Sequence, residues 1–175
     1  MTNINFHTTK SIEKGISLIE ILIVITIFAG LGILIAGSII LTLQGSQKSA
    51  ALVRARENLD YSLSIIERQI RGAKSISPCP NPDPKTVAYL DQDGNPSSFT
   101  CVNTGANNSF IASGSANVRI TSDGVKLTTC SFMCSLSVGS NQPVVSVDLA
   151  MQDASASGLQ SASVSATTQI FLRNY

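Results

Sequence analysis

The residue best placed to do chemistry in this sequence is a single carboxylate inside an aliphatic run. Glu20 is the only charged residue between Ile16 and Leu43. An ionisable group inside a hydrophobic helix costs about 2.5–3.5 kcal/mol on insertion scales, so it usually serves a function and has a partner. The alternative is a side chain that reaches the lipid headgroups at little cost. We expect Glu20 to have a partner.

Four cysteines form a second chemical set, and all of them lie in a Ser/Thr-rich segment: Cys79, Cys101, Cys130 and Cys134. An even number is typical of an oxidising compartment and predicts two disulfides. Three pairings exist, and we favour Cys79–Cys101 with Cys130–Cys134 because each is local. The second pair requires a turn between the two cysteines. Four residues of extended strand span about 13 Å, whereas the Cα atoms of a disulfide lie no more than about 7 Å apart. A zinc site is less favoured, since the spacing lacks paired CxxC motifs and histidine.

Catalysis is not expected of this chain, and neither is a metal or another cofactor. The one histidine, His7, lies near the N-terminus, which leaves the body of the chain without imidazole for nucleophilic catalysis. Oxygen ligands alternate in Asp91–Asn95, but without the distal glutamate of an EF-hand loop we expect an ordinary turn and not a calcium site. Residues 78–175 hold four basic and six acidic residues, so nucleic-acid binding by this chain alone is not predicted.

The composition also indicates how these residues are positioned. The chain has 175 residues, of which 43% are hydrophobic but only 13% charged and 5% aromatic. A soluble domain usually carries about 25% charged residues, so aliphatic residues must be concentrated in one place. They lie at 16–43. A helix of this length would measure roughly 42 Å, which exceeds the ~30 Å thickness of the hydrocarbon core of a bilayer. This segment is expected to cross a membrane.

An amphipathic segment follows the aliphatic run. Apolar residues recur there at steps of three and four, and we expect them to pack on the chain's own C-terminal domain: Leu52, Ala55, Leu59, Leu63, Ile66, Ile70 and Ala73. No proline interrupts 16–77, which predicts one long helix. Gly30, Gly32 and Gly37 are positions where it could bend, or where neighbouring membrane helices could approach.

After Pro78, short β-prone runs alternate with turn signals. Strands are expected at Thr86–Leu90, Ser98–Val102, Ser109–Ala112, Val118–Thr121, Val125–Thr129, Val144–Met151 and Val164–Leu172. Ser122-Asp123-Gly124 predicts a hairpin between two of them. The last strand alternates, which predicts a sheet with one covered face. The expected fold is α+β: a long N-terminal helix packed on a small antiparallel β-sheet head.

The start of the apolar run resembles the processing and methylation signature of type IV pilin-like proteins. The residues that carry the resemblance are Lys14-Gly15-Ile16-Ser17-Leu18-Ile19-Glu20 and the aliphatic run that follows. They combine a basic-glycine site, an uninterrupted aliphatic helix and one glutamate at a fixed offset. In this family a prepilin peptidase cuts after the glycine and methylates the new N-terminus. Many members have phenylalanine where this chain has Ile16.

The resemblance implies a role and a division of the chain. Cleavage would follow Gly15, Ile16 would be methylated, and Glu20 would pair with the N-terminal amine of a neighbouring subunit. The segments would be a leader (1–15), a transmembrane half-helix (16–43), an amphipathic half-helix (44–77) and an extracytoplasmic head (78–175). The partners would be the membrane, the prepilin peptidase/methyltransferase and other pilin or pseudopilin subunits. The chain would be a non-enzymatic minor pilin or pseudopilin.

Two alternatives to a pilus subunit stay open: an adhesin or DNA-uptake module at a filament tip, and a minor pseudopilin of type II secretion.

The sequence gives two indications of the membrane topology, and they disagree. Lys48, Arg54 and Arg56 follow the span, whereas Lys10 and Lys14 precede it, so the count of positive charges favours a cytoplasmic head. The family's arrangement and the cysteines favour an extracytoplasmic head on a single-pass protein of the inner or cytoplasmic membrane. After assembly the filament would be periplasmic or on the cell surface.

Overall fold

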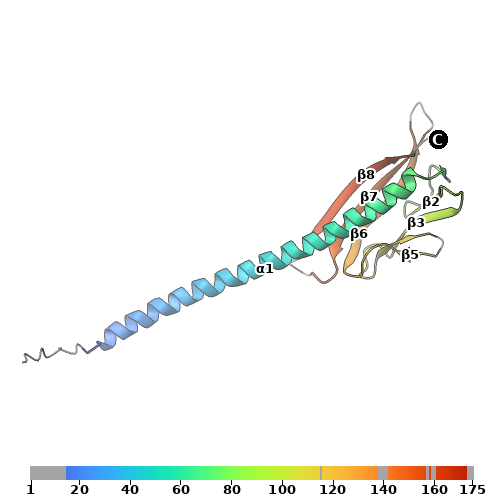
Figure 1. The fold of residues 1–175 in the computed structure, drawn as a ribbon. Helices are drawn as coiled ribbons and strands as arrows, with labels where there is room; N and C mark the ends of the chain where they lie inside the picture. The colour runs from blue at the N-terminus through green and yellow to red at the C-terminus, as the bar shows by residue number, and fades with distance from the viewer. Residues whose placement is uncertain (1–14, 115, 138–141, 157, 159–160, 173–175) are drawn as a thin grey trace, which may run out of the picture. The chain divides into compact units, whose positions relative to one another are not determined.

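The computed structural model describes residues 15–114, 116–137, 142–156, 158 and 161–172. The fold is α+β, with one long helix followed by eight strands among these residues (Figure 1). Helix α1 (Leu18–Arg71) comes first. The chain divides into two compact units, Met1–Leu43 and Gln44–Tyr175, so α1 contributes to both. His7, Lys10 and Lys14 lie outside the described residues.

The helix is continuous but shorter than the sequence predicts. It runs without a break through Gly30, Gly32 and Gly37, where a bend was considered. It ends at Arg71, next to Gly72, which the sequence marks as a helix stop, and not at residue 77, where we placed the limit of the amphipathic half-helix. Glycine at 72 permits a close approach of Gln92, since a Cβ there would lie 2.5 Å from the Gln92 amide nitrogen. The residues that follow are therefore free to pair with a strand.

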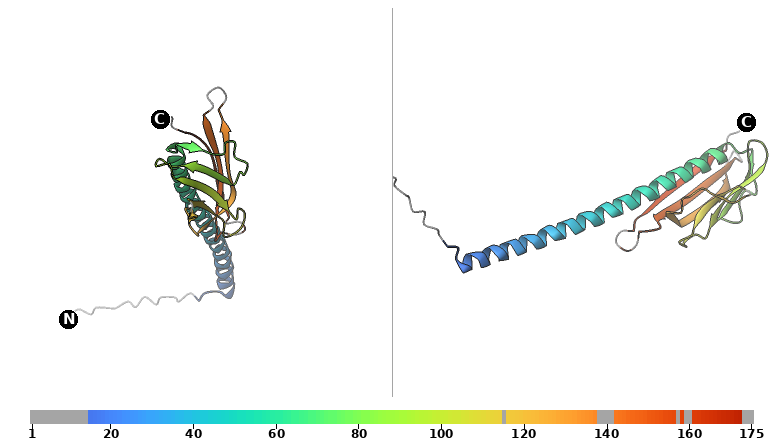
Figure 2. Two further views of the ribbon diagram at one scale, coloured as in Figure 1. Left: turned by 90° about the vertical axis from the view of Figure 1, so that its right-hand side faces the viewer. Right: turned by 60° about the horizontal axis from the view of Figure 1, so that its bottom comes forward.

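The head contains two antiparallel sheets, where the sequence suggested one (Figure 2). The first has the order β1-β2-β3-β4-β5, with β1 (Ser75–Ile76), β2 (Thr86–Leu90), β3 (Pro96–Val102), β4 (Phe110–Ser113) and β5 (Val118–Arg119). The second has the order β6-β7-β8, with β6 (Val125–Leu136), β7 (Pro143–Asp153) and β8 (Ser163–Phe171). All seven expected strands have a counterpart. Strand β1 was missed, and β6 continues seven residues beyond the Thr129 end that we expected.

The expected hairpin at Ser122–Gly124 is wrong. Strand β5 pairs with β4, and β6 pairs with β7, so this turn connects the two sheets. Arg119 holds the corner: its guanidinium donates to the carbonyls of Thr121 (2.8 Å) and Ser122 (2.9 Å) and pairs with Asp123. The connection is stabilised by a side chain, a contact that turn propensity does not reveal.

The hydrophobic core lies between the C-terminal half of α1 and the sheets (Figures 1 and 2). Helix residues Leu59, Ile66 and Ile70 are buried together with Phe99 and Phe132 of the strands. The predicted stripe is confirmed except at its N-terminal end, where Ala51 is buried and Leu52 is 39% exposed. The stripe is displaced there because Ser155 and Ala156, after β7, lie beside Ala51.

The alternation expected for the last strand is confirmed. In β8 the odd-numbered residues are exposed, and the even-numbered residues face the covered side. Among the latter, Ile170 is fully buried, and the Thr168 hydroxyl contacts the Glu67 carboxylate of α1 (3.1 Å). The second sheet is therefore covered by the helix on one face, as predicted.

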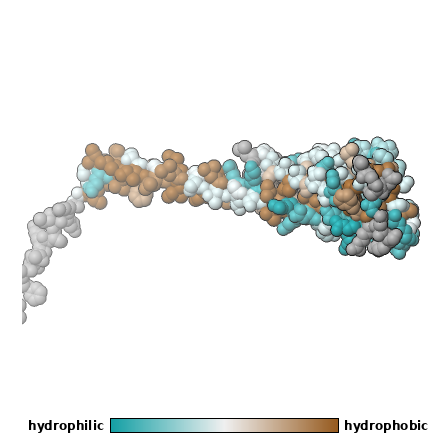
Figure 3. Space-filling view, turned by 90° about the horizontal axis from the view of Figure 1, so that it is seen from above, coloured by the Kyte–Doolittle hydropathy of each residue, from teal (hydrophilic) through white to brown (hydrophobic). Residues whose placement is uncertain are grey.

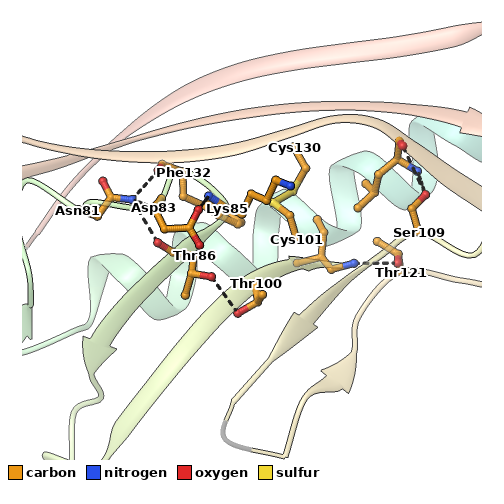
Figure 4. The surroundings of a disulfide bond; sticks show 12 residues. Asn81, Asp83, Lys85, Thr86, Thr100, Cys101, Ser109, Thr121, Cys130 and Phe132 are labelled. Carbon is orange, nitrogen blue, oxygen red and sulfur yellow. Dashed lines mark hydrogen bonds between the residues drawn. A yellow bond between two sulfur atoms is a disulfide. The ribbon is translucent and has the colours of Figure 1, made fainter. Parts of the chain in front are cut away.

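The four cysteines form two disulfides, but not in the pairing that we favoured. Cys79 bonds to Cys134 (Cα–Cα 5.3 Å), and Cys101 bonds to Cys130 (Cα–Cα 6.0 Å; Figure 4). The local pair Cys130–Cys134 is excluded because both residues lie in one extended strand, β6, without the required turn. Instead each bridge joins β6 to the first sheet, through the connection between β1 and β2 (Cys79) or through β3 (Cys101).

Candidate functional site

The start of α1 is the candidate site, and its geometry begins at Ser17. The Ser17 carbonyl accepts the N–H groups of Glu20 (3.0 Å) and Ile21 (3.3 Å), so Ser17 is the N-cap. Glu20 is then the third residue of the helix, and Ser-x-x-Glu is the capping-box pattern. A carboxylate in the first turn also interacts favourably with the helix dipole. Our sequence analysis did not note this spacing, which the two residues share with a capping box.

The carboxylate has no partner within the part of the chain that the structure describes. None of the hydrogen bonds or ion pairs found there involves the Glu20 side chain. It lies in a shallow apolar depression formed with Ile16, Ile21, Val24 and Ile25. These neighbours are 47–70% exposed. An acidic group surrounded by uncovered aliphatic side chains is suited to receive a cationic group delivered by a second molecule.

The described residues before the helix are exposed and non-helical. Gly15, Ile16 and Ser17 are exposed and precede the first helical residue, Leu18. The Gly15–Ile16 peptide bond is therefore outside the helical hydrogen bonding, and exposed non-helical segments are preferred sites of proteolysis. Lys14, which completes the predicted cleavage signature, lies outside the described residues.

The first half of α1 presents an aliphatic surface with nothing to cover it. Every residue from Gly15 to Ala50 is exposed, and Figure 3 shows the corresponding band of hydrophobic surface. By length and composition, α1 includes a segment that can cross a membrane. A water-soluble helix would hide such a surface, so this one requires lipid or other apolar helices around it.

Three hydroxyl groups within the aliphatic run are satisfied by the helix itself. Thr26 donates to the Ile23 carbonyl (2.8 Å), Ser38 to the Ile35 carbonyl (3.0 Å) and Thr42 to the Ser38 carbonyl (2.8 Å). Such bonds to the preceding turn remove the cost of placing a hydroxyl in hydrocarbon. Glu20 is therefore the polar group of this segment that most needs an external partner.

Four polar contacts attach the second half of the helix to the head. The strongest joins the Arg54 guanidinium to the Asp153 carboxylate at 2.7 Å, at the end of β7. Further along the helix, the Asn58 side chain accepts the Ser122 N–H (3.0 Å), Gln69 accepts the Tyr89 hydroxyl (2.5 Å), and Glu67 accepts the Thr168 hydroxyl (3.1 Å). Burial raises the pKa of Tyr89, so its hydroxyl stays protonated as a donor. These contacts fix the head on the helix at successive turns.

Asp153 is the central group of the first contact. Its side chain is 2% exposed, and one oxygen accepts the N–H groups of Ser155 (2.9 Å) and Ala156 (3.1 Å) while the other faces Arg54. The Ser155 hydroxyl bond and the Arg54 contact lower the pKa of Asp153. The ionised carboxylate thus organises both the end of β7 and its junction with α1.

The buried carboxylate makes the stability of the head sensitive to acid. Because the pKa of folded Asp153 lies below its ordinary value of 3.8, its contribution is present above that value and is lost as the pH falls through the folded pKa. We expect Asp153→Asn to lower the free energy of unfolding by about 1–3 kcal/mol at neutral pH. The variant should also lose less of its remaining stability than the wild type when the pH falls below ~4. Urea unfolding of the two chains between neutral and acidic pH measures both effects. Equal acid sensitivity in both chains would contradict the assignment.

The Asp91–Asn95 segment is an ordinary turn between β2 and β3. One Asp91 oxygen accepts the N–H groups of Asp93 (2.9 Å) and Asn95 (2.8 Å), and Gly94 has a φ of 87°. These backbone bonds, that of Asn95 first, lower the pKa of Asp91. These bonds are the ones that an Asx-type turn makes, in agreement with the expected turn.

Comparison of this chain with protein-family models, curated proteins and solved structures finds no significant match. What the chain does is therefore inferred from its own residues and their arrangement.

Proposed function

We propose that this protein is a structural subunit, a minor pilin or pseudopilin, of a type IV pilus-like filament. The observation that carries the proposal is Glu20: a carboxylate without a partner among the described residues, at the start of an exposed aliphatic helix and near an exposed Gly15–Ile16 bond. Cleavage of that bond creates an α-amine four residues from the glutamate. The subunit would then hold both halves of an ion pair at one end of its helix.

Geometry favours pairing between subunits over pairing within one. The helix begins at Leu18, and an amine at Ile16 of the same chain lies one residue before the N-cap, Ser17. Folding this amine back onto Glu20 would disturb the bonds that the Ser17 carbonyl accepts from the first turn. A neighbouring helix, displaced along the bundle, can deliver its amine to the depression around Glu20 while its aliphatic surface covers the rest. The pair would neutralise two charges that each resist burial, and it would set the register between subunits.

The other parts of the chain suit the same role. The exposed aliphatic segment would anchor the subunit in the membrane before assembly and form the filament core afterwards. The head, cross-linked by two disulfides, would face an oxidising compartment. Its four contacts with α1 would make helix and head move as one piece when a subunit is added. The partners would be the processing peptidase/methyltransferase, the membrane and other subunits.

Processing tests the proposal directly. Co-expressed with a prepilin peptidase, the chain is expected to lose residues 1–15 and to gain one methyl group at Ile16, as measured by the intact mass of the purified protein. Gly15→Val is expected to remain at full length, because a β-branched side chain at the cleavage site obstructs the peptidase. Gly45→Val, inside α1 and remote from the cleavage site, is the control with the same substitution. Cleavage elsewhere, or none, would contradict the proposal.

A further inference from the structure

A cavity outside the proposed assembly site lies between the end of α1 and the β2–β3 hairpin. Its volume is about 420 Å³, within the range of about 300–1,000 Å³ that is typical of small-molecule pockets. Three elements and one turn line it, with Arg68, Gln69, Tyr89, Asp91–Asp93 and Ser97. All of these residues are described and belong to the unit Gln44–Tyr175. The cavity is therefore a property of the head and the helix segment packed on it.

Contacts within the head hold the walls of the cavity in place. Tyr89 is buried, its ring stacks on Phe99 with centroids 5.5 Å apart, and its hydroxyl donates to the Gln69 side-chain oxygen at 2.5 Å. This bond fixes which end of the Gln69 amide is the oxygen, so the amide nitrogen is left as a donor. The backbone bonds that the Asp91 carboxylate accepts keep the turn after β2 in shape.

Gln92 takes its place in the cavity because residue 72 is glycine. A Cβ on Gly72 would lie 2.5 Å from the Gln92 amide nitrogen and 3.4 Å from its Cδ. Any side chain at position 72 would therefore displace the amide from the end of the helix. Since Gln92 is itself exposed, its amide is accessible to a molecule in the cavity.

The charges around the cavity restrict the class of ligand. Arg68 and Asp93 line the same space, and neither takes part in the ion pairs found among the described residues. An anion is disfavoured, because Asp91 and Asp93 bring two carboxylates against one guanidinium. A metal ion is disfavoured as well, since no group of three His, Cys, Asp or Glu side chains in the described part of the chain could hold one. None of the lining side chains is aliphatic, which disfavours an apolar molecule.

We propose that this cavity binds a neutral saccharide unit. Guanidinium, amide and carboxylate groups are planar and present two donors or two acceptors side by side, which suits neighbouring hydroxyls of a sugar ring. Each hydroxyl of the sugar both donates and accepts, so one ring satisfies Arg68 and Asp93 without bringing a charge of its own. The two amides and the Ser97 hydroxyl favour a ligand rich in hydroxyls over a zwitterion such as an amino acid.

The test uses the full, unprocessed chain in micelles of an amine-oxide detergent, whose head group contains neither sugar nor phosphate. The probes are glucose, galactose, mannose and N-acetylglucosamine, with inorganic phosphate and glycine as representatives of the disfavoured classes. At least one sugar is expected to bind with a dissociation constant of ~1–10 mM, as suits a ligand of about a dozen non-hydrogen atoms. Saturable NMR shifts are expected for the backbone amides of 89–97 and the side-chain amides of Gln69 and Gln92. Because the chain is unprocessed, a failure here is distinct from a failure of processing at Gly15.

Matched variants identify the site. Arg68→Ala and Gln92→Ala are each expected to weaken the sugar about tenfold, the effect of losing one hydrogen bond to a strongly polar group. Gly72→Ala, which displaces the Gln92 amide, is expected to weaken it as well. Arg56→Ala on α1 and Gln152→Ala on β7 remove the same side chains away from the cavity and are expected to leave binding unchanged.

Three outcomes would overturn the proposal. The first is the absence of a saturable shift with all four sugars, and the second is tighter binding of phosphate or glycine than of any sugar. The third is equal sugar binding by Arg68→Ala and Arg56→Ala, which would place the sugar elsewhere on the protein.

Discussion

Glu20→Ala is expected to reduce incorporation of the subunit into filaments by about 100-fold or more, while the chain stays in the membrane with a folded head. The physical reason is the amine that the proposed partner brings. Without the carboxylate this amine would be buried uncompensated, and breaking a buried ion pair costs about 3–5 kcal/mol. Recovery of subunits from sheared filaments, compared with their amount in membranes, measures the effect.

Two further variants separate pairing from helix capping, since Glu20 occupies the third helical position after Ser17. Glutamine preserves a capping box but carries no charge. If the ion pair matters, Glu20→Gln should be nearly as defective as alanine. If capping alone matters, it should behave as wild type, and the proposed role of Glu20 would be wrong. Glu57→Ala, an exposed glutamate of the same helix, is the matched control and should assemble normally.

The second large effect concerns the disulfides. Replacing Cys101 and Cys130 by serine is expected to lower the free energy of unfolding of the head by about 3–4 kcal/mol, and the Cys79–Cys134 pair by about 4 kcal/mol, because the bridges close loops of 29 and 55 residues. A head of this size has a total stability of about 5–15 kcal/mol. Either loss should therefore appear as a large fall in the urea midpoint.

Alanine substitution provides a control for the serine variants of the disulfides. Cys101 and Cys130 are 5% and 7% exposed, so serine there also buries hydroxyl groups, and alanine substitution of the same pair separates the two costs. Peptide mapping of the oxidised protein should recover Cys79 with Cys134. A map that shows Cys130 linked to Cys134, or urea midpoints unchanged in both double variants, would contradict the structure.

Local patterns were sufficient for much of the fold. The aliphatic run, the helical stripe and the alternation of β8 are properties of consecutive residues, and each appears in the structure. Strand β1 was not predicted, because Ser75–Ile76 is too short to show a period and forms only by pairing with Tyr89 and Leu90. The extension of β6 was missed because Ser and Cys obscured an alternation that is plain once Cys130, Phe132 and Cys134 are known to be buried.

The functional residues also divide into those that could be named from the sequence and those that only the structure reveals. Glu20 could be named as a lone carboxylate in an aliphatic run, and Gly15 and Ile16 could be named from the resemblance, because the proposed role of all three depends on neighbouring positions in the sequence. The Arg54–Asp153 contact could not, because its two residues are 99 positions apart and meet only through the packing of α1 on the end of β7. The Asn81 side chain depends equally on packing, because it bonds to Phe132 and Cys134, which lie 51 and 53 positions away.

The sequence by itself determined that this protein has an aliphatic helix with one carboxylate near its start, followed by an amphipathic spine and a β-rich, cysteine-containing head. These features follow from composition and period, which act over a few turns or strands. Only the tertiary structure decided that the strands form two sheets, and that Cys79 meets Cys134 and Cys101 meets Cys130. Those outcomes depend on which distant segments pack together, and packing is a property of the whole chain.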